Sequence, residues 1–379
     1  MEGASNSVAF VSTKDKGPIS FVSFVSFVVK MNPTMKAIVI HQHGGPEVLK
    51  YEDVPDPKPR KNEVLIRIKA CALNHLDLFI RKGLPGITLP HINGSDISGE
   101  VVESGEYITD LKPVTRVLLA PMVYCGHCQA CMSGRQNFCR DYSVLGRAVD
   151  GGNCEYIAVK REMVIPIQKD QMGNELTYDE AASVPLVFLT AWHMLVGRAG
   201  VKPGDVVLVL GGGSGVGSAA IQIGKLCGAR VIATAGDETK LDQCRDLGAD
   251  YTIHHHQQKI SDEVKKITAK AGVDIVFEHV GKATWEESIK SLKYGGTLVT
   301  CGATTGPEAA VNINVLFGKQ LSLLGSFMGT MGELHEVLKH IFAGRLKPVV
   351  DKTFPLREAA AAHQRMEEGK HFGKIVLNP

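Results

Sequence analysis

The sequence predicts an α/β protein, with a mostly β first half followed by a doubly wound parallel sheet. Three observations predict this class: short strands alternate with turns up to about residue 166, strands alternate with helices from about residue 177, and a glycine-rich loop separates a buried strand from a helix. A chain of 379 residues has room for two domains. Its hydrophobic fraction of 44% is enough for a sizeable core.

The first half contains short strand patterns. Strands are predicted at 35–42 and 48–51, on either side of a Gly-Gly-Pro turn, and at 63–70, where apolar and polar residues alternate. Three prolines between residues 55 and 59 mark a loop. Further short strands separated by turns extend to about residue 166, so this half is expected to be a β domain.

The second half changes to alternating helices and strands. Residues 176–196 are predicted to form one helix, with two acidic residues in its first turn. The apolar run 205–210 is typical of a buried parallel strand. The remaining predicted elements are a helix at 218–226, strands at 229–235, 273–277, 297–301 and 321–324, a helix at 332–343, and a strand at 373–379 that is expected to pack on the first half.

Charge and hydropathy exclude several classes of partner. The formal net charge is only +2, which gives no electrostatic reason to expect nucleic acid or an anionic membrane as a partner. No apolar run reaches the roughly 18 residues that a membrane span needs. Residues 19–29 are apolar but are interrupted by serines, and no small-residue cleavage site follows them. Residues 1–34 are therefore expected to be a disordered or non-native leader rather than a targeting signal.

The glycine loop after the 205–210 strand is the expected cofactor site. It contains Gly211, Gly212, Ser214, Gly215 and Val216, and it opens a helix, which is the context that dinucleotide binding requires. Glycines let the backbone approach a pyrophosphate, and a helix start offers unpaired N–H groups. A glycine turn without a ligand is the alternative.

The end of the next strand bears on which nicotinamide cofactor binds. In NAD-binding folds an acidic residue there usually accepts a hydrogen bond from the ribose 2′-hydroxyl. Here the strand ends with Thr234 and Ala235, and the first acid comes only at Asp237. Lys240 or the histidines at 254–256 can supply a donor to a 2′-phosphate, so NADPH is expected, with NADH as the alternative. For the histidines, a solvated loop without a ligand is the more ordinary interpretation.

Four of the nine cysteines lie close together in the sequence, at Cys125, Cys128, Cys131 and Cys139. Four thiolates repel one another unless a cation neutralises them, and tetrahedral zinc is the common solution. Because the protein fills all four positions, such a zinc would be structural. Disulfide pairing is the alternative. One cluster in a long chain is more typical of a reducing compartment, so a cytoplasmic protein is expected.

Together these features resemble the medium-chain dehydrogenase/reductase superfamily. The resemblance rests on the cysteine cluster, the glycine loop, the strand order and the final FGKIVLNP, and it extends from about Met35 to Pro379. It implies a GroES-like catalytic domain at 35–186 that carries the structural zinc and is completed by 326–379. It also implies a Rossmann domain at 187–325, with the active cleft between the two domains.

The resemblance further implies that the catalytic zinc of the family is missing. Its three ligand positions correspond to Asn74, Ser95 and Leu186, and none of these side chains is a thiolate or an imidazole. Leu76 stands at the hydroxyl relay position and cannot pass a proton. The pattern is similar to the zinc-free quinone oxidoreductase and enoyl reductase branch. This similarity implies reduction of quinones or activated C=C bonds (enals, enones, enoyl thioesters) by direct hydride transfer.

Several further positions match the functional residues of the family. Asn74 and Asp77 are the candidate catalytic residues, although a carboxylate at a helix start often has only a structural role. Thr190, Val280 and Gly302 match cofactor-binding positions.

Two other functions stay open at this point. One is an alcohol or aldehyde dehydrogenase with a displaced metal site, and the other is a nicotinamide-nucleotide-binding protein without turnover. The substrate is expected to be a small molecule. Similar proteins are usually homodimers or homotetramers.

Overall fold

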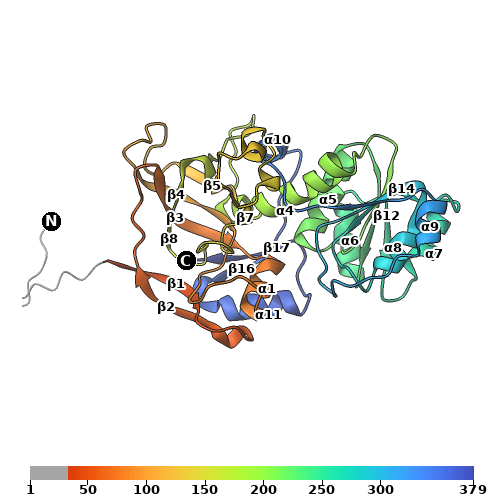
Figure 1. Cartoon of the computed structure of the whole chain (residues 1–379), viewed down its shortest axis with the longest axis horizontal. Coiled ribbons are helices and arrows are strands. Elements are labelled where there is room, and N and C mark those ends of the chain that lie inside the picture. Colours follow the sequence, from red (N-terminus) through yellow and green to blue (C-terminus); the bar gives the residue numbers. More distant parts are fainter. Residues whose placement is uncertain (1–32) are drawn as a thin grey trace, which may run out of the picture. The chain divides into compact units, whose positions relative to one another are not determined.

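The computed structural model describes residues 33–379, in which two large β-sheets are accompanied by helices (Figure 1). The leader predicted at 1–34 falls outside the described residues except at its end, where Thr34 already belongs to a strand. Within residues 33–379, no helix is long and apolar enough to cross a membrane.

The sheet of the second half has six strands, and each neighbouring pair is parallel. Its order is β12-β11-β10-β13-β14-β15. The strands are β10 (Val206–Val209), β11 (Arg230–Ala235), β12 (Tyr251–His254), β13 (Val273–Glu278), β14 (Leu292–Thr300) and β15 (Ser322–Gly325). The chain reverses its direction of travel across the sheet between β10 and β13, and ligands of such sheets bind at the carboxyl ends of the strands at this point. The doubly wound parallel sheet is confirmed.

Alternate residues of β10 face two different cores, as a strand buried on both sides requires. Val207 and Val209 pack with α4, α5 and α10, whereas Val206 and Leu208 pack with α7 and α8. The helices are α1 (His75–Lys82), α2 (Gln129–Met132), α3 (Tyr178–Ala182), α4 (Pro185–Trp192), α5 (Gly215–Leu226), α6 (Glu238–Asp246), α7 (Ile260–Ile267), α8 (Trp285–Ser291), α9 (Ile313–Gly318), α10 (Met331–Phe342) and α11 (Ala359–Glu367).

The other large sheet brings together strands that are distant in sequence. Its order is β16-β17-β3-β4-β5-β9, and β8 also pairs with β3. The strands are β3 (Glu63–Ala72), β4 (Asp96–Ser104), β5 (Arg116–Leu119), β8 (Tyr156–Lys160), β9 (Val164–Pro166), β16 (Val350–Pro355) and β17 (Lys374–Asn378). Two small sheets pair β1 (Thr34–Ile40) with β2 (Leu49–Pro55) and β6 (Met122–Val123) with β7 (Ser143–Val144). Because β17 lies between β16 and β3, the end of the chain completes the sheet of the first half.

Two predicted helices differ from the observed ones. Residues 176–196 do not form one helix: α3 ends at Ala182, α4 begins at Pro185, and a π-helical turn follows at His193–Arg198. Proline lacks an amide hydrogen and suits the first position of a helix, so it starts a new helix rather than continuing one. The helix predicted at 218–226 begins earlier, at Gly215, because the Ser214 hydroxyl caps it by accepting from the N–H of Gly217.

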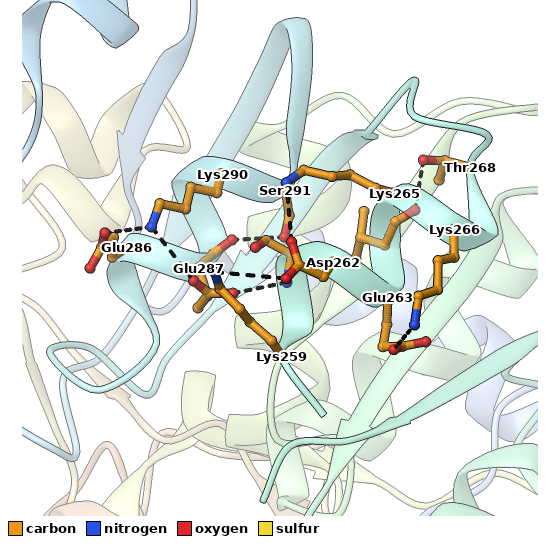
Figure 2. Close-up of polar contacts among 12 residues, drawn as sticks. Lys259, Asp262, Glu263, Lys265, Lys266, Thr268, Glu286, Glu287, Lys290 and Ser291 are labelled. Atoms are coloured by element: carbon orange, nitrogen blue, oxygen red, sulfur yellow. Dashed lines mark hydrogen bonds and ion pairs between the residues drawn. The ribbon is translucent and has the colours of Figure 1, made fainter. Parts of the chain in front are cut away.

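Helices α7 and α8 lie side by side and carry a network of charged side chains (Figure 2). Lys266 pairs with Glu263 at 2.7 Å. Between the helices, the N–H of Ser261 donates to Glu287 Oε2 at 3.0 Å and fixes the start of α7. Exposed ion pairs contribute little to stability, so this face is a solvated surface, and the two helices are joined by the Ser261–Glu287 hydrogen bond and by apolar packing beneath it.

Candidate active site

The structure has two adjoining cavities at the carboxyl ends of the central parallel strands. The first cavity has a volume of about 310 Å³. Residues from both halves of the chain line it, among them Asn74, Thr190, Gly302 and Lys374. The second, of about 810 Å³, follows the glycine loop to Gly236 and Lys240. The two cavities share five polar residues at their junction, which are His75, Ser214, His279, Thr304 and His371. Together they provide an elongated site of the size and place that a dinucleotide and a small substrate require.

The glycine loop is held tightly against the end of β11. The N–H of Gly211 donates to Thr234 Oγ1 at 3.0 Å, and the N–H of Gly212 donates to the Thr234 carbonyl at 2.8 Å. A Cβ at Gly217 would lie only 2.3 Å from the carbonyl oxygen of Gly211, so no larger residue fits there. The loop therefore presents the first turn of α5, with its unpaired N–H groups, to the cavities.

The predicted cofactor residues fall into two groups. Those that line a cavity are Thr190, Gly211, Ser214, Gly215, Val216, Lys240 and Gly302. Gly212, Thr234 and Val280 do not line either cavity. Gly212 is covered by Cys244, whose Sγ would be 2.8 Å from an added Cβ, and Thr234 is 1% exposed beneath the loop. Gly212 and Thr234 thus shape the loop from behind.

Three buried polar side chains meet at the floor of the first cavity. Lys374 Nζ donates to Asn74 Oδ1 at 2.6 Å and to Asp96 Oδ2 at 2.8 Å. Asn74 Nδ2 donates to the same Asp96 oxygen at 3.0 Å, and Asp96 Oδ1 accepts from the N–H of Leu186 at 2.8 Å. Since an ammonium only donates and a carboxylate only accepts, the orientation of the Asn74 amide is determined. We call these three residues the cleft-floor triad.

Asp77, the other candidate catalytic residue, lies behind this floor. It is fully buried, and its two carboxylate oxygens accept from the N–H groups of Asn74, at 2.7 Å, and Gly94, at 3.0 Å. The first contact is that of a capping box at the start of α1. Burial raises the pKa of Asp77 to about 6. These contacts hold Asn74 and the turn before Ser95 in place, which is a positioning role.

The three positions that correspond to catalytic zinc ligands do not fit a metal. Asn74 Oδ1 already accepts from an ammonium, and that charge repels a second cation. Ser95 is fully buried, and its hydroxyl has no hydrogen-bond partner among residues 33–379. The side chain of Leu186 offers no ligand atom at all. We therefore assign no metal to the cleft.

The cysteine cluster, by contrast, fits one zinc ion. The four Sγ atoms of Cys125, Cys128, Cys131 and Cys139 all lie within 4.8 Å of one another. The distances from Cys125 Sγ are 3.8 Å to Cys131 and 3.6 Å to Cys139. A tetrahedral zinc with Zn–S bonds of about 2.3 Å requires sulfurs about 3.8 Å apart. All nine cysteines are free thiols, so the disulfide alternative is wrong.

The histidine run at 254–256 forms the predicted solvated loop only in part, since His255 and His256 lie in a turn after β12 and His256 is exposed. His254 is the last residue of β12 and is 8% exposed, because the parallel sheet continues further than its polar sequence suggests. His255 and His256 line the second cavity, and their Nε2 atoms would lie 3.1 and 2.8 Å from a Cβ added to Gly236. Burial lowers the pKa of His255 to about 4, so this imidazole is neutral at pH 7.

Several residues that line the cleft were not predicted. His279 follows β13, and its Nε2 lies 2.8 Å from the Leu210 carbonyl oxygen. Its place at the carboxyl end of a central strand was an available signal. Phe327 and Met328 belong to the connection after β15, whose path no local pattern fixes. Lys374 stands in the FGKIVLNP ending, but nothing local marks its side chain as part of the cleft.

Comparisons with known proteins agree with this architecture. Residues 60–169 match the alcohol dehydrogenase GroES-like domain, and residues 215–343 match the zinc-binding dehydrogenase family. An alcohol dehydrogenase of Geobacillus stearothermophilus is 32% identical over 90% of this chain and 99% of its own. The acryloyl-coenzyme A reductase of Sulfurisphaera tokodaii is 32% identical over 91% of this chain and 100% of its own.

A human quinone oxidoreductase is 28% identical over 90% of this chain and 97% of its own. Among solved structures, that of an NAD-dependent alcohol dehydrogenase is 43% identical, with a TM-score of 0.87 over 91% of this chain and 100% of that one. The relatives thus include both alcohol dehydrogenases and reductases of quinones and acryloyl-coenzyme A.

Proposed function

The chain belongs to the medium-chain dehydrogenase/reductase superfamily and is an NAD(P)-dependent oxidoreductase, and on this premise we propose that it reduces quinones or activated C=C bonds by direct hydride transfer. One observation carries the proposal. The cleft-floor triad, in which Lys374 donates to both Asn74 and Asp96, includes Asn74, one of the three positions at which a metal-dependent alcohol dehydrogenase needs an open metal ligand.

Alcohol oxidation and the reduction of activated C=C bonds differ in whether they need a metal or a base. Alcohol oxidation has to remove a hydroxyl proton, which a Lewis acid or a base makes possible. Leu76, at the relay position, lines the cleft and cannot carry that proton. Hydride addition to a polarised alkene or a quinone needs mainly alignment of the two reactants and donors near the oxygen that becomes negative.

The protein's own residues supply that alignment in the proposed reaction. Thr190 and Gly302 line the first cavity on the side of the parallel sheet and would flank the nicotinamide. Asn74 and Lys374 lie on the floor, and the apolar side chains of Leu186 and Phe327 complete the lining. A substrate bound there would lie between the nicotinamide and this floor.

We propose NADPH as the preferred cofactor. No acid ends β11, where Ala235 is followed by Gly236. The imidazoles of His255 and His256 and the ammonium of Lys240 border the same end of the second cavity, which suits a 2′-phosphate. Asp237 opposes this preference, but its carboxylate already caps α6 by accepting from the N–H of Lys240 at 2.9 Å, and it lies 3.7 Å from the Lys240 ammonium.

We also propose one structural zinc in the cysteine cluster and a homodimer built through β15. This strand is the edge of the six-stranded sheet, and it is only half-buried. Nearby, Ile313 and Phe317 in α9 are 70% and 66% exposed. An uncovered strand edge with exposed apolar neighbours is a natural place for a two-fold pairing of sheets.

The test is cofactor consumption by the full-length enzyme. NADPH and NADH are each combined with a quinone, an enal, an enone and an enoyl thioester, and NADP⁺ and NAD⁺ are combined with simple alcohols. We expect NADPH-dependent turnover of the alkenes or quinones that persists in the presence of a chelator. Alcohol oxidation that the chelator abolishes immediately, without turnover of the alkenes and quinones, would refute it and would support the alcohol dehydrogenase alternative.

A further inference from the structure

The Lys374 side chain is fixed at both of its ends. Lys374 is the first residue of β17 and is only 3% exposed. Its stem lies against the start of α5, since a Cβ at Gly215 would be 2.8 Å from Lys374 Cδ. The preceding residue, Gly373, donates its N–H to the carbonyl of Gly213 at 2.9 Å, which ties the strand to the glycine loop. The ammonium is therefore held at a defined point between the cofactor loop and the cleft floor.

The hydrogen-bond partners of Lys374 leave part of its ammonium free. An ammonium has three N–H donors. Two of them are directed to Asn74 Oδ1 and Asp96 Oδ2, and no further acceptor for Nζ is found among residues 33–379. Since Lys374 lines the first cavity together with Asn74 and Thr190, the remaining donor is available to a molecule bound there.

The charge of Asp96 is already balanced by other groups. Its carboxylate is fully buried and accepts from three donors, which are the N–H of Leu186, Asn74 Nδ2 and Lys374 Nζ. Hydrogen bonds to a carboxylate spread its charge and stabilise the ionised form. The ammonium and the carboxylate compensate each other, because a lone buried charge on either side would be far more costly. A fixed cation at the floor of the cleft is the consequence.

We propose that the Lys374 ammonium is the electrophilic group of this cleft, which stabilises the negative charge that develops on the substrate oxygen during hydride transfer. This inference rests on the proposed reductase function. It gives the triad a task beyond structure: Asp96 and Asn74 are positioning residues that hold the ammonium, and Lys374 is the catalytic residue. This ammonium stabilises the developing negative charge by electrostatics, as a metal ion does in metal-dependent enzymes.

With an enone as the substrate, the C4–H bond of the dihydronicotinamide breaks, and the hydride with its electron pair forms a C–H bond at the β-carbon of the enone. The π electrons of the C=C bond move toward the carbonyl, which leaves an enolate whose oxygen accepts a hydrogen bond from Lys374. The cofactor is oxidised and the substrate is reduced by the same two electrons. A water molecule then protonates the α-carbon and leaves as hydroxide to the solvent, while Lys374 keeps its proton.

The test uses variants of the full-length enzyme. Lys374→Met alone leaves the buried Asp96 carboxylate without its main partner and can fail to fold, so Asp96→Asn/Lys374→Met is made beside it. Lys352→Met, an exposed lysine on the neighbouring strand β16, is the matched control. Two quantities are measured: kcat with enones of graded electron demand, and the Kd of NADPH from its fluorescence.

We expect the double variant to bind NADPH as the wild-type enzyme does and to lose about 100-fold in kcat, the effect of removing one donor to a developing oxyanion. The loss should be larger for weakly activated enones, which place more charge on the oxygen. A deuterium isotope effect from 4-deuterated NADPH should increase, because hydride transfer becomes slower relative to the other steps.

Two results would overturn the inference. One is an unchanged kcat in the double variant, which makes the pair purely structural. The other is a higher Kd for NADPH with an unchanged kcat, which would show that Lys374 binds the cofactor phosphates. Both leave the proposed function intact, whereas a wild-type enzyme that reduces no enone or quinone refutes the proposed function itself.

Discussion

His193 Nδ1 lies 2.7 Å from Glu333 Oε1, and this hydrogen bond connects the residues around the cysteine cluster with the wall of the cleft. The other ring nitrogen of His193 lies 3.3 Å from the amide nitrogen of Asn137, which stands between Cys131 and Cys139. Glu333 lies in the first turn of α10, directly after the Phe327–Thr330 segment, in which Phe327 and Met328 line the first cavity. The Tyr142 hydroxyl also donates to the carbonyl of Gly329 in this segment, at 3.4 Å.

Loss of the structural zinc should therefore affect both stability and substrate binding. Cys131→Ser removes one of four ligands and is expected to lower the zinc content and to reduce Tm by about 5 °C or more. The KM for the substrate should rise, because Asn137 and Tyr142 no longer hold the cleft wall. Metal analysis and thermal unfolding check this, with Cys227→Ser, outside the cluster, as the control. A fully zinc-loaded Cys131→Ser protein would contradict the four-ligand site.

The glycine loop gives a prediction about the cofactor alone. Gly217→Ala places a Cβ 2.3 Å from the backbone oxygen of Gly211 and should displace the loop. The Kd of both NADPH and NADH is expected to rise by at least about tenfold, which corresponds to 1.4 kcal/mol. Gly224→Ala is the control, since it lies in the same helix and its Cβ would contact only the side chain of Val231, at 3.0 Å, and no backbone atom. Equal cofactor binding by the two variants would disprove the role of the loop.

Cofactor selectivity should depend on Lys240. Lys240→Ala removes the ammonium that borders the end of β11, and the Kd of NADPH is expected to rise by about tenfold, or 1.4 kcal/mol. NADH has no 2′-phosphate, so its Kd should stay unchanged and serves as the internal control. Fluorescence titration with both cofactors measures this. A parallel loss for the two cofactors would show that Lys240 supports the loop instead of selecting the phosphate.

Asp77 should make stability depend on pH. Its pKa of about 6 in the folded protein lies above the ordinary value of 3.8, because burial disfavours the charged form. Between these two values the folded state binds a proton that the unfolded state has released. The stability present below pH 3.8 is therefore lost as the pH rises to about 6, and the loss amounts to roughly 3 kcal/mol.

The measurement for Asp77 is denaturant unfolding between pH 4.5 and 7, compared with Asp77→Asn. The variant cannot ionise at this position, so the difference in unfolding free energy between wild type and variant should move against the wild type as the pH rises. A difference that stays constant over this range would mean that Asp77 keeps an ordinary pKa.

The edge strand β15 leads to a prediction about assembly. Phe317→Asp places a charge on the exposed apolar surface beside this edge and should convert the proposed dimer into a monomer. Sedimentation of the wild type, of Phe317→Asp and of the control Met172→Asp, at a site that is 83% exposed, gives the answer. A wild-type monomer, or a dimer that Phe317→Asp does not weaken, would place the interface elsewhere or nowhere.

The sequence predicts the parts of this molecule whose signals are local. β10, the glycine loop and α5 follow one another in the chain, and a run of apolar residues followed by glycines and a helix pattern predicts them directly. The cysteine cluster is equally local, and four thiols at this spacing reach one metal wherever the lobe packs.

Contacts between distant segments could not be predicted in the same way. Asn74 and Lys374 are 300 residues apart and meet only because β17 pairs with β3. The expectation for Asn74 was therefore incomplete without its partner. The single helix expected at 176–196 shows a second limit, because the helical pattern continues through Pro185 while the backbone does not.

The position of β17 has a consequence for how the protein is made. This strand comes later in the chain than every other strand of its sheet, yet it lies in the interior of that sheet, between β16 and β3. Until residue 374 has left the ribosome, the carboxylate of Asp96 has no ammonium beside it and β3 has an open edge. The nascent chain must therefore keep its first domain unfinished until β17 has been synthesised, and a truncation that removes Lys374 leaves a cleft without its cation.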